Sequence, residues 1–537
     1  MRTYKNTYIS QSGRFKPLGS QKRICSALTI LLLFCSVINA EPEKFPVQAG
    51  EFVRITEDVS LPAGAALQFE SGTYEKLRGH NRIRLTGFPL TKRESVDLEL
   101  EKFEVTTPST IIVEGTAEGD KPVPHPEVVL FRGRVAGVED SEAVIGISPY
   151  GNNGYIRKGQ LLYYLAPDRK PGKAGRTDLH SIAEQLEITG GSWPKDYPCD
   201  VKQNPDFVSA EEIFDCMWDI APPPPPPYDW RVAFVAVECD NEYLDHFGGD
   251  VGAALAYVLQ LAGTSSHFFE RDIYIKWYLS YIRIWTTTDP YPDYVDPNIA
   301  FASFAYYWQA NMDHIDRDLA LQFSCKTRTG LSMCPSLCDY DIGYTINYDL
   351  QGWFPRPVQD LHADNWDLHV VPHEAGHTFG SHHTHCYKPA IDSCPPAGSD
   401  GDNPWCQGRT DFNDCVPGTI MSYCGGDNCG GYANEIMSFH PRVVRCIREY
   451  VDFSDCIRHG MNPVYADWSN TGDEDGSPAN PFNTVAEAVQ VVIPNGTVNI
   501  GVGVYRETET ISVNPHGFTI DRPVTLRTTG GMVTIGG

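Results

Sequence analysis

The first part of the chain consists of short apolar runs that alternate with Gly, Pro and Asp or Asn residues. Such runs occur at residues 128–131, 143–147 and 161–165, among others. Short β-branched and aromatic runs bounded by turn-forming residues are typical of strands. The pattern therefore predicts a β-rich domain over residues 41–221.

Six consecutive prolines at residues 222–227 mark the clearest boundary in the chain. Proline has a fixed φ and no backbone N–H to donate, so this stretch is predicted to be an exposed polyproline II linker. After it, a β-branched run, an apolar stretch at helical spacing and a second β-type run follow at residues 230–237, 250–269 and 274–285. This order of strand, helix and strand predicts an α/β unit with a right-handed crossover.

The pattern changes again after Cys456, beyond which no cysteine occurs. Short Val, Ile and Thr runs recur there after one predicted helix near residues 484–492. A separate, mostly β domain is therefore predicted over residues 459–537. A chain of 537 residues is also too long for a single hydrophobic core, so several domains are expected.

The longest apolar run covers residues 24–38 and is only 15 residues long. A helix needs about 20 apolar residues to cross a bilayer, so a membrane span is not expected. The run follows six basic and no acidic residues and ends near Ala40, a small residue at the cleavage position. Residues 1–40 are therefore predicted to be a signal peptide, and the protein is expected to be secreted or at the cell surface.

The charge of the chain narrows the choice of partners. Against 43 basic residues stand 69 acidic ones, which gives a formal net charge of -26. Binding phosphates requires Lys and Arg residues that displace counterions. Nucleic acid is therefore not expected as a partner.

The cysteines predict a disulfide-bonded domain, because an oxidising compartment does not keep thiols free. Of 16 cysteines, two lie in the predicted signal peptide, and Cys199 and Cys216 precede the prolines. The other twelve lie between Cys239 and Cys456. An even number confined to one segment predicts internal disulfides there, with a connectivity that the spacing does not specify.

Residues 373–383 read HEAGHTFGSHH and fit H-E-x-x-H-x-x-G-x-x-H at every fixed position. On a helix, His373 and His377 lie on one face and can bind one ion. Gly380 permits a backbone turn closed to other residues, which brings His383 round as a third ligand. Three imidazoles with an open fourth position indicate a catalytic Zn²⁺. Glu374 is the predicted general base for a water molecule at that position.

Met421 lies in a predicted turn about forty residues further on, where its side chain could form an apolar floor beneath the imidazoles. With this methionine, residues 228–458 resemble the metzincin zinc endopeptidases, most of all their reprolysin (adamalysin) branch. The resemblance implies a multidomain protein whose α/β catalytic domain has a twisted mixed sheet and a disulfide-stapled C-terminal half. It also implies one catalytic Zn²⁺ and a protein or peptide substrate. Residues 128–168 resemble the β-rich propeptide of such enzymes, which implies a zymogen.

Several residues depart from the reprolysin pattern. Thr384 stands where reprolysins commonly have Asp, and the turn at Met421 looks more like that of astacins and serralysins. In those relatives a tyrosine can approach the zinc, so Tyr423 is a candidate additional ligand or oxyanion stabiliser, the alternative being a packed turn tyrosine. Pro372 implies a helix that starts there or is kinked. His382 and His385 are expected to be exposed loop residues rather than a second metal site.

Enzymes of this kind are usually held inactive until export, and a thiolate of the prosegment can occupy the open zinc position. Cys199 is the candidate for such a cysteine switch. Cys199 and Cys216 are, however, the two cysteines of this region, and parity favours a local disulfide between them. Both alternatives remain open at this point.

The last residues resemble the opening of a right-handed parallel β-helix of the pectin-lyase type. Such a fold needs about three coils, whereas about one or two fit before Gly537. We therefore expect either a truncated gene product or a piece that caps against its neighbouring domain or against another chain. Asp473, Glu474 and Asp475 are a candidate Ca²⁺ site, the alternative being a solvated acidic turn.

Two functions from different classes follow. The first is a secreted zinc endopeptidase made as a zymogen. The second is a cell-surface adhesion or carbohydrate-binding protein whose β-helix carries the function and whose peptidase domain processes it or is silent. The complete motif favours the first, because an inactivated domain could lose Glu374 without penalty to its fold. Cleavage preference and oligomeric state are not specified by the pattern.

Overall fold

The computed structural model describes residues 45–56, 64–168, 172, 177–184, 199–203, 215–218, 228–293, 296–327, 329–354, 366–392, 418–424, 435–454, 457–494, 496–505 and 524–535. By its contacts the chain divides into Met1–Glu43 and Lys44–Gly537, and every described residue belongs to the second unit. The predicted signal peptide and the polyproline linker lie outside the described residues. No helix in the described part of the chain is long and apolar enough to cross a membrane.

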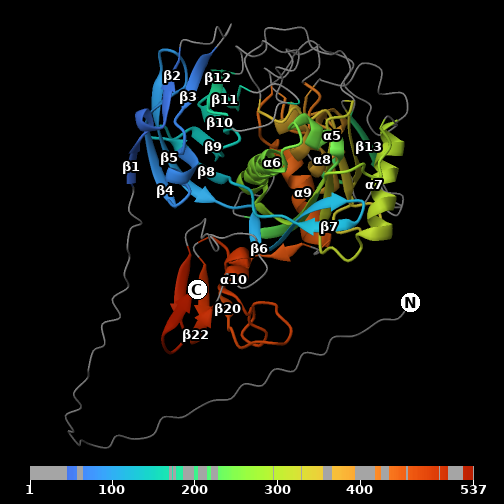
Figure 1. Cartoon of the computed structure of the whole chain (residues 1–537). Coiled ribbons are helices and arrows are strands. Elements are labelled where there is room, and N and C mark those ends of the chain that lie inside the picture. Colours follow the sequence, from blue (N-terminus) through green and yellow to red (C-terminus); the bar gives the residue numbers. More distant parts are fainter. Residues whose placement is uncertain are drawn as a thin grey trace, which may run out of the picture. The chain divides into compact units, whose positions relative to one another are not determined.

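A ten-stranded, mostly antiparallel sheet contains most of the N-terminal strands (Figure 1). Alternating burial along β4 and β5 places one face of this sheet on a core, as expected for antiparallel strands. The predicted β-rich character of this region is confirmed, while its role as a propeptide stays a prediction. In sheet order, the strands are β1 (Phe45–Gln48), β4 (Arg82–Pro89), β5 (Ser95–Phe103), β8 (Val129–Val135), β9 (Ser141–Ile147), β10 (Asn153–Lys158), β11 (Leu161–Pro167), β12 (Leu179–Glu184), β3 (Ala65–Phe69) and β2 (Val53–Ile55).

A second, mixed sheet carries the segment with the histidine motif. Its central strands are buried along their whole length, which is typical of strands covered on both faces. In sheet order, its strands are β13 (Cys199–Gln203), β17 (Gly330–Cys334), β18 (Tyr344–Asn347), β16 (Leu319–Phe323), β14 (Arg231–Cys239), β15 (Ile275–Trp285), β6 (Thr106–Thr116) and β7 (Gly119–Pro122), and β19 (Arg458–His459) pairs with β14.

The predicted strand, helix and strand unit is present. Strands β14 and β15 are parallel, and α6 (Val251–Ile273) connects them. The helix begins after Asp250, whose carboxylate accepts a hydrogen bond from the Ala253 N–H at 3.0 Å. It ends at Tyr274, which has a left-handed backbone conformation. The other helices of the described residues are α1 (Thr73–Leu77), α4 (Asp215–Trp218), α5 (Asn241–His246), α7 (Pro297–Asn311), α8 (Trp366–Thr378), α9 (Pro441–Ser454) and α10 (Val485–Val491).

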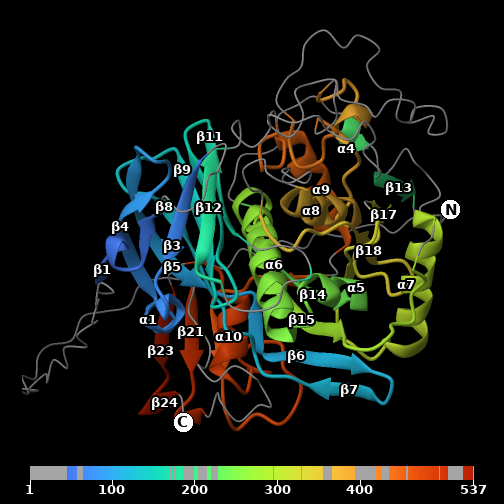
Figure 2. The same cartoon turned by 45° about the horizontal axis from the view of Figure 1, so that its top comes forward.

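Helix α6 lies between the two sheets in both cartoon views (Figures 1 and 2). One face packs on β15 and on α8, and another contacts β9 of the ten-stranded sheet. Its buried side chains belong to a core cluster that also contains Leu130, Tyr155 and Tyr164 of the N-terminal strands. The two sheets therefore share one hydrophobic core through this helix.

The hairpin β6–β7 leaves the ten-stranded sheet between β5 and β8 and joins the second sheet instead. Strand β6 pairs in parallel with β15, with Tyr281 opposite Ile111 and Trp285 opposite Gly115. The sequence pattern assigns these residues to an N-terminal domain and contains no sign of this exchange. Strand β15 consequently has neighbours on both sides, β14 and β6.

The predicted local disulfide between Cys199 and Cys216 is wrong. Cys216 is bonded to Cys446, with an S–S distance of 2.08 Å and a sequence separation of 230 residues. The reason is topological: Cys199 lies in β13 at the edge of the second sheet, whereas Cys216 lies in α4, which packs on α9. The expectation that cysteines pair only within residues 239–456 therefore fails as well. Among the described cysteines, Cys239, Cys325 and Cys334 carry no disulfide.

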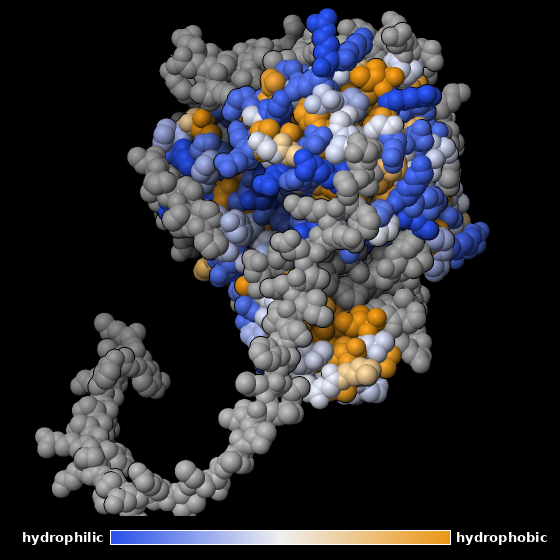
Figure 3. All heavy atoms as spheres, turned by 90° about the vertical axis from the view of Figure 1, so that its left-hand side faces the viewer, coloured by the Kyte–Doolittle hydropathy of each residue, from blue (hydrophilic) through white to orange (hydrophobic). Residues whose placement is uncertain are grey.

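The C-terminal piece contains short parallel strand pairs, whose strands lie before and after α10 in the chain. The strands are β20 (Val464–Ala466), β21 (Thr497–Ile500) and β23 (Thr525–Thr528) in one group and β22 (Gly503–Tyr505) with β24 (Val533–Ile535) in another. Parallel pairing is what stacked coils require, but the β-helix itself stays a prediction. Exposed apolar side chains gather on this piece, which forms the lower end of the coloured surface in Figure 3.

The candidate Ca²⁺ residues of this piece have local partners. Asp475 accepts hydrogen bonds from the Ser477 N–H at 2.8 Å and from the Asn480 side chain at 3.0 Å. The side-chain amide of Asn483 donates to Glu474. These contacts stabilise an acidic turn, and calcium binding there stays a prediction.

A buried ion pair links the ten-stranded sheet to α6. Glu142 of β9 accepts hydrogen bonds from Nη1 of Arg271 through both carboxylate oxygens, at 2.7 Å each, and its Oε1 lies 2.7 Å from Nε2 of His267. Burial alone would raise the pKa of Glu142, but the attraction of Arg271 and the bond to His267 outweigh it and lower the pKa to about 2. Glu142 is therefore ionised in the folded protein over the whole ordinary pH range.

This ion pair predicts a pH dependence of stability. A carboxyl whose pKa is lower in the folded than in the unfolded protein stabilises the fold above the unfolded value of 4.5 and loses that effect as the pH falls towards 2. At pH 7 we expect Glu142→Gln to lower the free energy of unfolding by about 3 kcal/mol, because it leaves Arg271 partly unpaired. Between pH 4.5 and 2, calorimetry should show a steeper fall in thermal midpoint for the wild type than for Glu142→Gln.

A matched control for this prediction is Glu75→Gln, since the Glu75 side chain is 51% exposed in its pair with Arg78. It should follow the wild-type pH profile. If Glu142→Gln and the wild type lost stability in parallel over this pH range, the ion pair would not be the source of the effect.

Candidate metal centre

Helix α8 presents the first two histidines of the motif, and a sharp exit from the helix presents the third. The Nε2 atom of His377 lies 3.2 Å from that of His373 and 3.0 Å from that of His383. Three nitrogens bound to one tetrahedral Zn²⁺ at 2.0–2.1 Å would lie about 3.3 Å apart. Both distances are close to this value, and all three ligand atoms lie within 4.8 Å of one another, so the three imidazoles could hold a single zinc ion.

The hydrogen bonds of the ligands' outer nitrogens favour the same arrangement. Nδ1 of His373 lies 2.6 Å from the Ile420 carbonyl, and Nδ1 of His377 lies 2.6 Å from the Ser381 carbonyl. A proton on Nδ1 leaves the lone pair of Nε2 directed at the common point. Burial lowers the pKa of His373, His377 and His383 well below the usual value, which keeps them neutral, as metal binding requires.

Gly380 enables the turn that brings in His383. Its φ of 97° belongs to the region that side chains disfavour, and a Cβ there would meet Cβ of Tyr450 at 2.9 Å. The Ser381 N–H donates to the Gly376 carbonyl at 3.0 Å, which closes the end of the helix. The expectation for this glycine is met in the structure.

The proline in the helix is not at its start. Helix α8 begins at Trp366, so Pro372 lies inside it, one residue before His373. The alternative that the helix starts at Pro372 is wrong. The whole helix is buried between α6 and the strands β17 and β18, and this packing is what retains a residue that lowers helix stability.

Met421 lies against helix α8 at Gly376, between His373 and His377. A Cβ added to Gly376 would meet Sδ of Met421 at 2.4 Å, so the thioether occupies the space that this glycine leaves open. Thr384 donates hydrogen bonds to the Met421 carbonyl from its N–H at 2.9 Å and from Oγ1 at 3.2 Å. Thr384, the departure from the reprolysin pattern, therefore ties the third ligand's loop to the methionine turn.

Glu374 projects towards strand β17. The hydroxyl of Ser332 hydrogen-bonds to its carboxylate and lies 2.9 Å from its main-chain carbonyl oxygen. Gly330 of the same strand lies beside the carboxylate as well, and a Cβ there would come within 2.0 Å of Oε1 of Glu374. The carboxylate is thus enclosed by one hydroxyl and by the backbone of a strand that has room for no side chain at residue 330.

Comparison with known proteins adds one finding. Residues 229–433 match the model of Metallo-peptidase family M12, a segment that includes the three histidines, Glu374 and Met421. The match supports a metallopeptidase. No curated protein sequence matches the chain. Zinc is the metal that such peptidases usually bind, and the spacing of the three Nε2 atoms fits it.

Tyr423 lies next to His373 and His383, within the matched residues 229–433, which we call the peptidase segment. Its ring centroid is 4.2 Å from that of His383 and 6.1 Å from that of His373. The rings of Tyr423 and His373 are nearly parallel. The position is compatible with a role at the metal, and this role stays a prediction. The side chain is buried and 4% exposed.

The expectation for His382 and His385 is wrong in one respect. Neither is an exposed loop residue, because their exposed fractions are only 6% and 2%. Burial lowers the pKa of His382 to about 4 and that of His385 to about 3. A second group of metal-ligand type, His383, His385 and Cys386, shares its first member with the triad, and its cysteine is disulfide-bonded.

Sequence reasoning missed a support of the site, His369. It lies four residues before His373, on the same helix face, and the two ring centroids are 5.1 Å apart. Nδ1 of His369 lies 3.1 Å from a carboxylate oxygen of Glu435, and the other oxygen accepts from the Ser422 hydroxyl at 3.4 Å. The histidine spacing is visible in the sequence, but its partner is 66 residues away, so no local pattern could have identified the pair.

We predict that the pair of His369 and Glu435 supports metal affinity. Glu435→Gln replaces the carboxylate that lies beside His369 and that accepts a hydrogen bond from Ser422 of the methionine turn. Loss of such an outer partner typically costs 10- to 100-fold in metal affinity, and we expect a rise of about this size in the zinc dissociation constant. Competition with a chelating dye measures it.

Glu449→Gln is the matched control, because the Glu449 side chain is 49% exposed and forms an ion pair with Arg445 on the same helix. Equal zinc affinities for the two variants would show that the buried pair does not act on the metal centre.

Proposed function

We propose that the protein is a secreted zinc-dependent endopeptidase that is made as a zymogen. The observation that carries the proposal is the convergence of three neutral imidazole nitrogens next to Glu374 within a segment similar to metallopeptidases. The apolar segment after a basic N-terminus supports export. The adhesion or carbohydrate-binding alternative is not favoured, because every residue that the chemistry needs is present.

The substrate would be an extended peptide. Without β13, strand β17 would be the edge of the second sheet, and its free N–H and C=O groups could pair with a peptide strand. Gly330 and Ser332 of this strand lie beside Glu374. A peptide paired with β17 would therefore have its backbone next to the carboxylate and the imidazoles.

The residues of the chain divide the chemistry as follows. Zinc, when bound by His373, His377 and His383, supplies a Lewis acid that promotes attack of water on the peptide carbonyl. Glu374 takes a proton from the attacking water and passes it to the nitrogen of the leaving amine. Ser332 holds the carboxylate of Glu374 in place. The Tyr423 hydroxyl is the candidate to stabilise the oxyanion or to act as an additional ligand.

Glu374→Ala tests the assignment of the base. We expect the purified variant to contain as much zinc as the wild type, because Glu374 is not a ligand. Chelator-sensitive cleavage of a denatured protein should fall by about 10²- to 10⁴-fold, the usual contribution of a general base. Glu449→Ala serves as the control and should retain activity. Undiminished cleavage by Glu374→Ala would refute the mechanism.

We further propose that strand β13 keeps the precursor inactive, with Cys199 as the switch residue. The support is the register: β13 pairs in parallel with β17, and Cys199 stands opposite Gly330, the residue next to Glu374. The bond from Cys216 to Cys446 removes the alternative partner that parity favoured for Cys199. A switch of this kind acts through a thiolate that takes the open coordination position of the metal.

Cys199→Ser tests this switch. We expect the uncut precursor of this variant to cleave peptide, whereas the uncut wild type does not, because a serine hydroxyl binds zinc far more weakly than a thiolate. Fluorogenic peptide assays before and after limited proteolysis measure the difference. Cys216→Ser removes a cysteine of the same region and should leave the precursor inactive. A Cys199→Ser precursor as inactive as the wild type would exclude the thiolate as inhibitor.

A further inference from the structure

The N-terminal strands are joined to the peptidase segment by a continuous sheet. Strand β6 supplies the second neighbour of β15, and the Leu279 N–H donates to the Val105 carbonyl at 2.6 Å. The Thr110 hydroxyl donates to the Leu279 carbonyl, also at 2.6 Å. Departure of the N-terminal part would leave a full edge of β15 without partners, and buried backbone groups rarely lack them.

Buried charges cross the same boundary. Asp120 of β7 accepts hydrogen bonds from Nη2 of Arg283 and from the Tyr281 hydroxyl, both at 2.6 Å. The Arg283 side chain is only 5% exposed. Together with the pair of Glu142 and Arg271, this makes two carboxylates from the N-terminal strands that each pair with a buried or half-buried arginine of the peptidase segment. Separation would break both pairs and leave Arg271 with Asp272 and Arg283 with Glu238 as their remaining carboxylates.

The boundary is also packed as tightly as a core. A Cβ at Gly146 of β9 would meet Cγ of Gln260 at 2.4 Å, and a Cβ at Gly263 of α6 would meet Leu130 at 2.6 Å. The side chain of Gln260 donates to the Gly151 carbonyl at 2.9 Å. Close approach from both sides, with paired polar groups, is characteristic of permanent interfaces rather than of transient ones.

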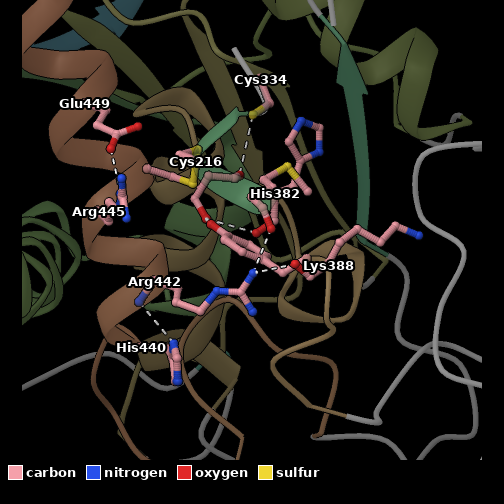
Figure 4. The surroundings of a disulfide bond; sticks show 12 residues. Cys216, Cys334, His382, Lys388, His440, Arg442, Arg445 and Glu449 are labelled. Atoms are coloured by element: carbon pink, nitrogen blue, oxygen red, sulfur yellow. Dashed lines mark hydrogen bonds and ion pairs between the residues drawn. A yellow bond between two sulfur atoms is a disulfide. The ribbon is translucent and has the colours of Figure 1, made fainter. Parts of the chain in front are cut away.

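A disulfide adds a covalent link between the two sides (Figure 4). Cys216 of α4 is bonded to Cys446 of α9. The neighbouring Met217 carbonyl accepts hydrogen bonds from the Lys388 N–H at 3.0 Å and from Nη2 of Arg442 at 2.7 Å. The chain before the prolines is therefore held on α9 by one covalent bond and one hydrogen bond, and a second hydrogen bond comes from Lys388.

We propose that the N-terminal sheet, formed by strands within residues 45–184, is a permanent structural part of the peptidase and not a segment that activation releases. A cut between Trp218 and Tyr228 would produce two chains that stay joined through Cys216 and Cys446. A cut between Gln203 and Asp215 would leave the sheet held by the shared strands and buried charges alone. Activation would then require only that β13 leaves β17. This inference goes beyond the proposed function and holds whether or not the protein binds zinc.

The test places a recognition sequence for a site-specific protease in the full-length chain, in the stretch between Trp218 and Tyr228. After cutting, we expect one band of uncut mass in non-reducing denaturing electrophoresis and two bands with reductant. Cys446→Ser should give two bands without reductant. Two bands from the unreduced, otherwise wild-type protein would overturn the covalent link.

A second full-length variant, with the recognition sequence between Gln203 and Asp215, tests the interface without the disulfide and without any cysteine substitution. We expect both fragments to co-elute in gel filtration at pH 7. With Asp120→Ala and Glu142→Gln together, the N-terminal fragment should dissociate about 30-fold faster or more, as expected for buried charges left unpaired. Glu75→Gln should not change the rate. Separate elution of the two unsubstituted fragments would overturn the proposal, and zinc content measured in parallel reports independently on the proposed function.

Discussion

The requirement that three imidazoles point their Nε2 atoms at one place governs this structure. Neutral imidazoles that face one another have little favourable interaction energy of their own. Each ring must therefore be held in place by a hydrogen bond to its other nitrogen. For His373 and His377 this is done by backbone carbonyls, of which the Ile420 carbonyl comes from a turn 47 residues away. The site consequently depends on the packing of the methionine turn against α8, in the space that Gly376 leaves open.

That packing in turn depends on what lies behind α8. The helix is buried along its entire length, against α6 on one side and against β17 and β18 on another. The other face of α6 contacts β9 of the N-terminal sheet. The position of the metal centre is thus connected, through a single helix, to strands that the chain order would assign to a different domain. Removal of the N-terminal sheet would therefore expose a face of α6, the helix that supports α8 and its histidines.

Part of the fold and of the site can be predicted because the information is local. The histidine spacing specifies two ligands on one helical face and Gly380 specifies the exit, since both depend on helix geometry alone. Helix α6 and its two flanking strands follow from periodicity. Prediction fails where burial or distant partners decide: His382 and His385 are polar and adjacent to a loop, yet the surrounding chain covers them. Cysteine parity fails because Cys216 reaches a partner 230 residues away.

The sequence by itself determined the chemistry of the centre, namely which residues could hold a metal and which carboxylate stands beside them, because those residues lie within eleven positions of one another. Only the tertiary structure decided what holds that chemistry in place. Ser332 at Glu374, Glu435 at His369 and strand β6 at β15 come from distant parts of the chain. No short-range pattern encodes such contacts, since they arise when separate elements bury their apolar faces together and their remaining polar groups must find partners.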